Sequence, residues 1–225
     1  MKSLKAAFPY SLPVLAGYLF LGIAFGLVMD THGYPVIYSV VMSVLIYAGA
    51  LEFAAVPLLA QAFNPVGAFF FALMINARHI FYGLAMLPKY KGLGRAKWPL
   101  AFMLTDETFS ILSSVEVPDG VDKKGFYFWV SILDYSYWVG GTALGALFGK
   151  VIPWDLTGLD FSLSCLFIVM FIEQAQSKTG RISGFTGAAA TFIALLVFGK
   201  DNMVVAAMIL IVAALLPERR VIERD

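Results

Sequence analysis

Charged residues are scarce in this chain: only 14% of its 225 residues are Asp, Glu, Lys or Arg, whereas a soluble domain typically contains about 25%. Hydrophobic residues make up 60% of the sequence, and the mean hydropathy is +0.82. This balance excludes an ordinary soluble domain. It predicts an all-α polytopic membrane protein, because helices satisfy their own backbone hydrogen bonds inside a bilayer.

Residues that commonly perform catalysis or bind metal are also few. The chain has one cysteine, Cys165, which excludes an internal disulfide, and two histidines, His32 and His79. No metal-ligand spacing, nucleophile–base pair or phosphate-binding loop occurs, so we predict neither an enzyme nor a bound cofactor or metal. A net charge of +1 provides no basic surface for a nucleic acid.

Hydrophobic segments follow one another along the whole chain. Eight can be counted, at residues 10–29, 36–62, 66–87, 98–115, 126–149, 161–176, 183–198 and 202–216. The connections between them are short, and no linker or low-complexity stretch divides them. We therefore expect six to eight helical segments within a single transmembrane domain over residues 1–225.

Lysine and arginine residues gather in four short polar stretches, and such residues favour the cytoplasmic side. These stretches are the N-terminus, residues 89–97, residues 178–181 and the C-terminus. If all eight segments crossed the bilayer, residues 89–97 would lie on the opposite side from the N-terminus. The conflict disappears if segments two and six are broken or re-entrant and return to the face they enter from. Both termini are then cytoplasmic.

A weak internal repeat supports this topology. Residues 21–26 (LGIAFG) and 144–149 (LGALFG) end segments one and five with a similar pattern, and an acid in an apolar run follows each, Glu52 and Glu173. Broken helices at matching positions of two inverted halves are typical of secondary transporters. The alternative is a chance match in a glycine-rich membrane protein.

An arginine lies near the middle of the segment at residues 66–87. Arg78 at that depth costs about 3 kcal/mol unless it has a partner or water. Arg78 and Tyr82 are four residues apart and share one helix face, as do Asn76 and His79. We expect Arg78, Asn76 and Tyr82 to bind substrate, and His79 either to take part in proton coupling or to pack. The alternative for Arg78 is that its side chain extends to the end of the segment.

Five carboxylates occur within apolar runs. Asp106 and Glu107 are adjacent and point about 100° apart on a helix, so one can pair with Arg78. Asp134, near the middle of segment five, is a second candidate partner, and we expect Asp106 and Asp134 in a substrate-binding site. Asp106, Glu107, Glu52 and Glu173 are the candidates for carrying protons. The alternative is that some of these acids only reach the membrane surface.

Several motifs together resemble the AzlC-type branched-chain amino acid permeases, the larger subunit of the branched-chain amino acid exporters. The resemblance covers nearly the whole chain. The motifs that carry it are AGALEF (48–53), INARH (75–79), LTDETF (104–109), and GLDF (158–161) with LF (166–167). The second and third, in this order and at this spacing, are the most specific.

The resemblance implies export of a small apolar amino acid (Val, Leu, Ile or Met) across the inner membrane of a bacterium or archaeon. It also implies a small AzlD-type membrane subunit as partner. One position departs from the family pattern, because members usually have glutamine where this chain has Glu52. An extra acid there leaves a second hypothesis open, a channel or carrier for ions or other small solutes.

Overall fold

The computed structural model describes residues 2–59, 64–150, 168, 171–172, 175–176 and 178–222. The chain forms two compact units, Met1–Leu163 and Ser164–Asp225. The described residues are helical with short turns and contain no strand, which confirms the predicted all-α fold. Most of predicted segment six, including Cys165 and the candidate Glu173, lies outside the described residues.

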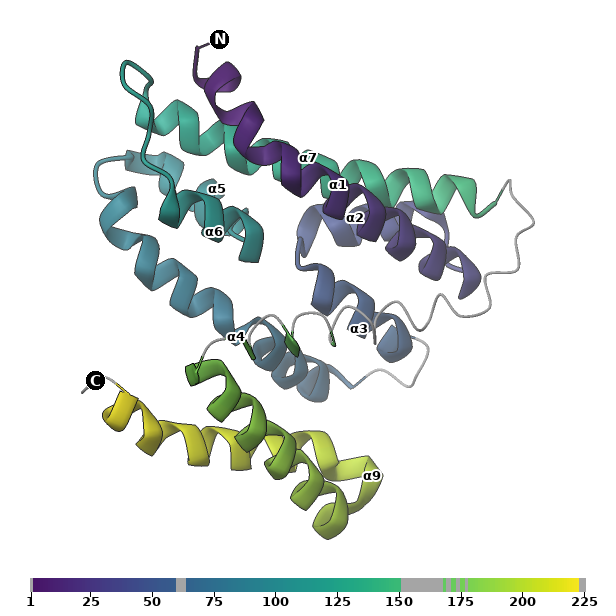
Figure 1. Cartoon of the computed structure of the whole chain (residues 1–225). Coiled ribbons are helices and arrows are strands. Elements are labelled where there is room, and N and C mark those ends of the chain that lie inside the picture. The colour runs from purple at the N-terminus through teal and green to yellow at the C-terminus, as the bar shows by residue number, and fades with distance from the viewer. Residues whose placement is uncertain are drawn as a thin grey trace. The chain divides into compact units, whose positions relative to one another are not determined.

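Seven α-helices and one 3-10 turn are described in the first unit (Figure 1). They are α1 (Lys2–Thr31), α2 (Val36–Leu45), α3 (Gly49–Leu59), α4 (Pro65–Tyr90), η1 (Gly94–Ala96), α5 (Lys97–Phe102), α6 (Asp106–Ser114) and α7 (Lys123–Phe148). Helices α4, α6 and α7 begin after Asn64, Thr105 and Asp122 respectively. Each of these side chains accepts a hydrogen bond from the backbone N–H three residues later, which is a typical helix N-cap.

Helices α1 and α7 lie side by side and form the largest contact of the first unit (Figure 1). Glycines permit this close approach. A Cβ atom on Gly22 would lie 2.8 Å from the carbonyl oxygen of Trp138. A Cβ atom on Gly26 would collide with the backbone of α7, and one on Gly145 with the backbone of Ile23. Both glycine-containing stretches of the predicted repeat therefore have a packing role, and the inverted repeat itself stays a prediction.

Predicted segment two is broken, as the distribution of lysine and arginine in the sequence suggested. Helix α2 ends at Leu45 and α3 begins at Gly49. Between them, Tyr47 has φ 45°, a left-handed conformation that is uncommon for a bulky residue. The Tyr47 side chain is buried. The break is observed, whereas the re-entrant path of this segment stays a prediction.

Predicted segment four differs from the expectation of one continuous helix. It is divided into α5 and α6 by residues 103–105, so that Asp106 and Glu107 form the first turn of α6. The physical reason is local: the Thr105 side chain caps α6 and turns the chain into an extended conformation, with φ −101° and ψ −179°. The first unit therefore contains two interrupted helices.

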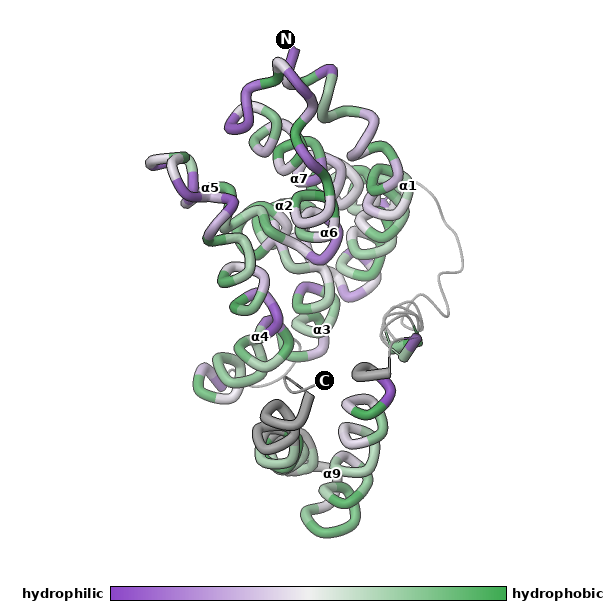
Figure 2. The backbone as a smooth tube through the Cα atoms, turned by 60° about the vertical axis from the view of Figure 1, so that its left-hand side comes forward, coloured by the Kyte–Doolittle hydropathy of each residue, from purple (hydrophilic) through white to green (hydrophobic). Residues whose placement is uncertain are grey.

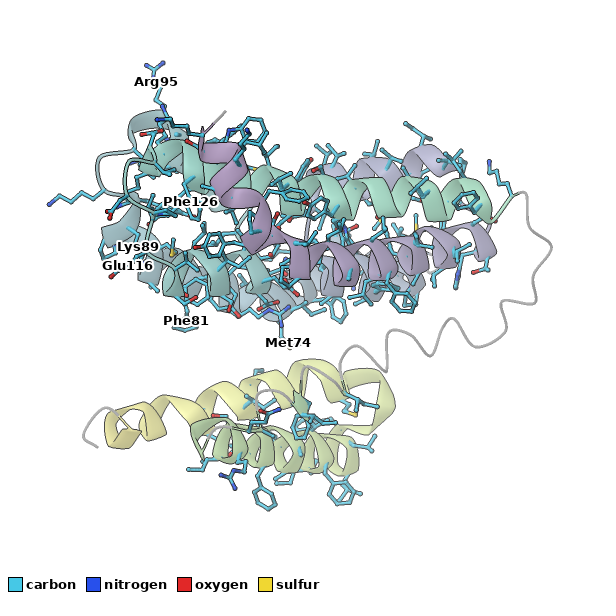
Figure 3. The ribbon with its side chains drawn as sticks, turned by 45° about the horizontal axis from the view of Figure 1, so that its top comes forward. Met74, Phe81, Lys89, Arg95, Glu116 and Phe126 are labelled. Carbon is cyan, nitrogen blue, oxygen red and sulfur yellow. The ribbon has the colours of Figure 1, made fainter. Side chains whose placement is uncertain are left out.

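Helix α4 has an outer and an inner face. Its outer face consists of exposed apolar side chains, among them Phe81, which lies at the edge of the unit in Figure 3. Its inner face includes the buried Met86 and Tyr90. Near the same end, the Lys89 ammonium donates hydrogen bonds to the carbonyls of Leu112 and Ser113 at the end of α6, at 2.8 and 2.7 Å. This contact ties α4 to the last turn of α6, where carbonyl groups lack helical partners.

Three of the described helices are long and apolar enough to cross a membrane: Lys2–Thr31, Pro65–Tyr90 and Arg181–Gly199. Figure 2 shows hydrophobic residues along the helices and hydrophilic residues gathered in turns such as the one between α4 and α5. The buried part of the first unit includes Phe126, which is fully covered (Figure 3). These features agree with a membrane protein.

The second unit contains α9 (Lys178–Ile222), which joins predicted segments seven and eight. Gly199, with φ 70° and ψ 179°, interrupts the helix between them. Glycine suits this position because a side chain is strained at positive φ. The two arms of α9 lie side by side (Figures 1 and 3). Phe171 and the small residues Gly184, Gly187 and Ala188 line an open apolar groove of about 530 Å³ within this unit.

Candidate functional site

The first turn of α6 is the centre of the candidate site, because its side chains contact residues of α1, α4 and α7. It carries two adjacent acids, Asp106 and Glu107, which a helix N-terminus favours electrostatically. The two side chains point to different neighbours, as the 100° helical rotation predicts. Asp106 is directed to α4, and Glu107 to α1.

Arg78 of α4 forms an ion pair with Asp106, with 2.9 Å between Nη2 and Oδ2. The hydroxyl group of Tyr82, one turn later on α4, donates a hydrogen bond to the other oxygen, Oδ1. The two side chains of the ion pair are 25% and 35% exposed. Three of the residues predicted from the sequence therefore meet at one partly exposed point.

Aromatic contacts hold this cluster in place. The Tyr82 ring stacks on Phe109 of α6, with ring centroids 4.5 Å apart and planes within 11°. His79 meets the Tyr82 ring edge-on at 5.7 Å. The Asn76 side chain lies on the same helix, and its Oδ1 atom is buried without a hydrogen-bond partner among the described residues. The Asn76 Oδ1 atom is thus an unpaired acceptor two residues before Arg78.

A second cluster connects α1, α6 and α7 through hydroxyl groups. Tyr18 Oη lies 2.6 Å from Thr105 Oγ1 and 2.5 Å from Glu107 Oε2. Thr105 Oγ1 donates to Thr108 Oγ1 at 3.1 Å, and Thr108 Oγ1 donates to Asp134 Oδ2 at 2.8 Å. Asp134 is completely buried, and its second oxygen, Oδ1, has no hydrogen-bond partner in the described part of the chain.

The two helix breaks are joined by an aromatic group beside this cluster. Tyr47, from the break between α2 and α3, lies 4.7 Å from Tyr135 of α7 and 6.4 Å from Phe102 at the end of α5, measured between ring centroids. The Tyr135 hydroxyl donates to the carbonyl of Val44 at the end of α2, at 2.8 Å. Helix α7 thus holds both interruptions next to one buried polar region.

Glu52 of α3 has different partners from those of the other acids. It is completely buried, and its Oε1 accepts hydrogen bonds from the Ala48 backbone N–H at 3.0 Å and from Trp138 Nε1 at 3.1 Å. The Trp138 ring also covers Gly49, where a Cβ atom would lie 2.6 Å from it, and meets Tyr18 edge-on. Glu52 therefore holds the start of α3 against α7.

Substitutions at Glu52 test this positioning role. We expect Glu52→Gln to leave the unfolding temperature nearly unchanged, because the amide oxygen accepts the same two hydrogen bonds. Glu52→Leu leaves two buried donors without an acceptor, each of which costs about 1–3 kcal/mol. Thermal unfolding of the purified protein in detergent measures the difference. Equal unfolding temperatures for the two variants would contradict the role.

The predicted candidates therefore do not all meet at one point, and Asn76 lies on α4 beside Arg78 without a hydrogen-bond partner for its Oδ1 atom among the described residues. Arg78, Tyr82 and Asp106 are in direct contact, and His79 packs on Tyr82. Asp134 and Glu107 lie at the two ends of the hydroxyl cluster, Glu52 contacts Trp138, and Glu173 lies outside the described residues.

Sequence reasoning missed the hydroxyl residues Tyr18, Thr105 and Thr108. For Thr105 a signal existed, because a threonine followed by two acids is typical of a helix start. Tyr18 carries no local signal. Its contact with Glu107 depends on how α1 packs against α6. Among the described residues, no group of three or more His, Cys, Asp and Glu side chains is placed to hold a metal ion.

Comparison with known proteins places the sequence in a family. The family model described as "AzlC protein" matches residues 13–152, more than half of the chain. The "Branched-chain amino acid transport protein AzlC" of Bacillus subtilis is 44% identical over 220 residues, which are 98% of this chain and 87% of that protein. The chain belongs to the AzlC family.

Other relatives of this AzlC-family chain include membrane proteins of further bacteria. An "Uncharacterized membrane protein" of Haemophilus influenzae is 41% identical over 91% of the chain and 84% of its own length. The "Inner membrane protein YgaZ" of Escherichia coli is 30% identical over 75% of the chain and 71% of its own length. No solved structure matches.

Membership confirms the resemblance seen in the sequence motifs, and it confirms that the chain is a membrane protein. The AzlC family is a family of transport proteins and not of enzymes. All the motif residues in the described part of the site, at 48–53, 75–79 and 104–109, lie within the matched region. The two helix breaks and both polar clusters therefore lie within the part of the chain that the family model matches.

Proposed function

We propose that this protein is a secondary transporter that exports branched-chain or similar apolar amino acids, namely Val, Leu, Ile or Met, in exchange for protons. The observation that carries the proposal is the similarity over nearly the full chain to a protein named for branched-chain amino acid transport. The two interrupted helices support it, since transporters commonly bind substrate where helices are broken near the middle of the membrane.

An amino acid zwitterion needs a cationic partner for its carboxylate and an anionic partner for its ammonium group. In the proposed site, Arg78 binds the carboxylate, with Asn76 and Tyr82 as hydrogen-bonding neighbours. The partial exposure of the ion pair supports this role, because a completely buried pair would leave no room for a substrate carboxylate. The ammonium group is bound by Asp106 or Asp134. Asp106 lies two residues before Thr108 in the sequence, and Asp134 accepts a hydrogen bond from the Thr108 hydroxyl group.

Proton coupling is assigned to the carboxylates near the breaks. The sequence candidates are Asp106, Glu107, Glu52 and Glu173, with His79 as a further titratable group. Asp106 already pairs with Arg78, and Glu52 accepts hydrogen bonds from the Ala48 backbone N–H and from Trp138. Glu107, by contrast, is exposed and lies against a hydroxyl group.

The remaining parts of the proposal concern the cellular setting. The protein lies in the inner membrane with both termini in the cytoplasm and works with a small AzlD-type membrane subunit. The distribution of lysine and arginine supports the orientation. The exposed apolar face of α4 supports contact with lipid or with another membrane helix.

Counterflow in liposomes tests the transport function. Purified protein is reconstituted, with and without a co-encoded small membrane subunit, into vesicles loaded with unlabelled leucine. We expect saturable uptake of labelled leucine, competed by valine and methionine but not by lysine, because the proposed substrates share an apolar side chain whereas the side chain of lysine is cationic. Vesicles loaded with lysine provide the matched control.

Two results would contradict the proposal. Absence of leucine exchange under both conditions would show that leucine is not a substrate. Ionic conductance without saturation would favour the second hypothesis, a channel or carrier for other small solutes.

A further inference from the structure

A row of side chains connects an exposed carboxylate to a completely buried one. It runs from Glu107 through Tyr18, Thr105 and Thr108 to Asp134, with four consecutive oxygen–oxygen contacts of 2.5 to 3.1 Å. Tyr18 has a single hydroxyl proton, so the four contacts form a continuous hydrogen-bonded row when Glu107 is protonated and donates to Tyr18. Glu107 is exposed, whereas Thr108 and Asp134 are completely buried. Each of the three intermediate groups is a hydroxyl, which both donates and accepts a hydrogen bond.

We infer that this row is a proton relay, with Glu107 as the group at which protons enter and Asp134 as the group that receives them. The inference rests on the proposed function and deepens it, because it names the route and the receiving carboxylate of the coupling. Neither Tyr18 nor the two threonines were candidates from the sequence.

The proton transfer balances along the row. A proton on Glu107 passes to the Tyr18 oxygen while the Tyr18 proton passes to Thr105, that of Thr105 to Thr108, and that of Thr108 to Asp134. Every hydroxyl group ends with one proton, and every hydrogen bond reverses its direction. Glu107 loses one proton and Asp134 gains one. No water, metal or cofactor is required for the transfer.

The surroundings of Asp134 suit a receiving group. Its Oδ1 atom has no hydrogen-bond partner among the described residues, and an isolated buried carboxylate is costly to keep ionised. A proton or an ammonium group at Oδ1 removes that cost. If the two compete for this oxygen, arrival of a proton releases the substrate, which is the basis of exchange. Asp106 has no oxygen without a partner, because Oδ2 pairs with Arg78 and Oδ1 accepts a hydrogen bond from Tyr82.

Other titratable groups lie around the row. Tyr47, from the break between α2 and α3, is close enough to influence Asp134 and Glu107 electrostatically. Asp106 lies next to Glu107 on α6. On α7, one turn after Asp134, Trp138 binds Glu52 of α3. These groups surround the relay, and Tyr47 lies beside its Tyr18 and Thr108 members.

Two single substitutions interrupt the relay and preserve side-chain shape: Tyr18→Phe and Thr108→Val. Matched controls are Tyr90→Phe and Thr142→Val, since both residues are buried and their hydroxyl groups have no hydrogen-bond partner among the described residues. The variants are reconstituted into liposomes that contain a pH-sensitive dye. Leucine counterflow at equal pH and acidification driven by a leucine gradient are measured on the same vesicles.

We expect Tyr18→Phe and Thr108→Val to slow leucine-driven acidification about tenfold or more, equivalent to about 1.4 kcal/mol, while counterflow at equal pH changes by less than about twofold. The two controls retain both activities. If the relay variants acidify the vesicles as fast as the wild type, the relay is wrong while the transport function stands.

Infrared spectroscopy after a pH jump tests the relay without any substrate. The infrared band of protonated Asp134 is identified by its absence in Asp134→Asn. After the pH jump, we expect this band to appear more slowly in Thr108→Val than in Thr142→Val. If the wild type exchanges no leucine but this delay is seen, the proposed function fails and the relay stands. If the band rises equally fast in both variants, the relay is overturned.

Discussion

Replacing Gly145 with alanine is expected to destabilise the protein strongly. The new Cβ atom would overlap the backbone of Ile23, so α1 and α7 would have to separate along their main contact. Overpacking of this kind typically costs about 1–3 kcal/mol, and a backbone neighbour cannot rotate away as a side chain can. The unfolding temperature in detergent, followed by tryptophan fluorescence, measures the effect.

Gly140 provides a matched control on the same helix. A Cβ atom there meets no heavy atom within 4 Å. Gly140→Ala is therefore expected to stabilise the protein by about 0.5–1 kcal/mol, since glycine is unfavourable within a helix. The two substitutions are chemically identical and lie five residues apart, yet we expect opposite signs. Equal unfolding temperatures would show that α1 and α7 do not pack through these glycines.

Local periodicity explains which parts of the site were predictable from sequence. Arg78 and Tyr82 share a helix face by their spacing, and a charge in an apolar run needs a partner. Those two rules together led to the pairing of Arg78 with an acid, and the structure identifies that acid as Asp106. The separation of the two arms of α9 at Gly199 follows equally from the interruption of an apolar run.

The break between α5 and α6 shows where such reasoning stops. Residues 98–115 form a nearly continuous apolar run, and hydropathy alone does not distinguish one helix from two. The cap formed by Thr105 decides the outcome, because it ends the run one residue before Asp106. Recognising that cap in the sequence would have placed both acids at a helix N-terminus.

The hydroxyl cluster was beyond prediction for another reason. Tyr18 and Glu107 are 89 positions apart, and Thr108 and Asp134 are 26 apart. Such pairs depend on the packing of α1, α6 and α7, which the glycines of α1 and α7 permit. A periodic pattern identifies the face of a helix that is buried, but it does not identify the residue on another helix that the face meets.

The Arg78–Asp106 ion pair allows a binding role to be separated from a structural one. Arg78→Gln is expected to abolish leucine counterflow, and Asp106→Asn to reduce both folded yield and transport, because it removes the carboxylate that neutralises Arg78. Breaking a buried pair costs about 3–5 kcal/mol, and we expect less here because both side chains are partly exposed. Arg95→Gln is the control, since Arg95 is exposed and extends away from the first unit (Figure 3).

The double variant Arg78→Gln/Asp106→Asn decides between the two roles. Removing both charges leaves no uncompensated ion, so we expect folded yield and unfolding temperature to recover toward those of the wild type. If Arg78 binds the substrate carboxylate, leucine counterflow stays about tenfold or more below wild type in the well-folded double variant, a loss of about 1.4 kcal/mol of binding free energy. Recovery of counterflow together with stability would show that the pair only supports the fold, and the carboxylate of the substrate would then need another partner.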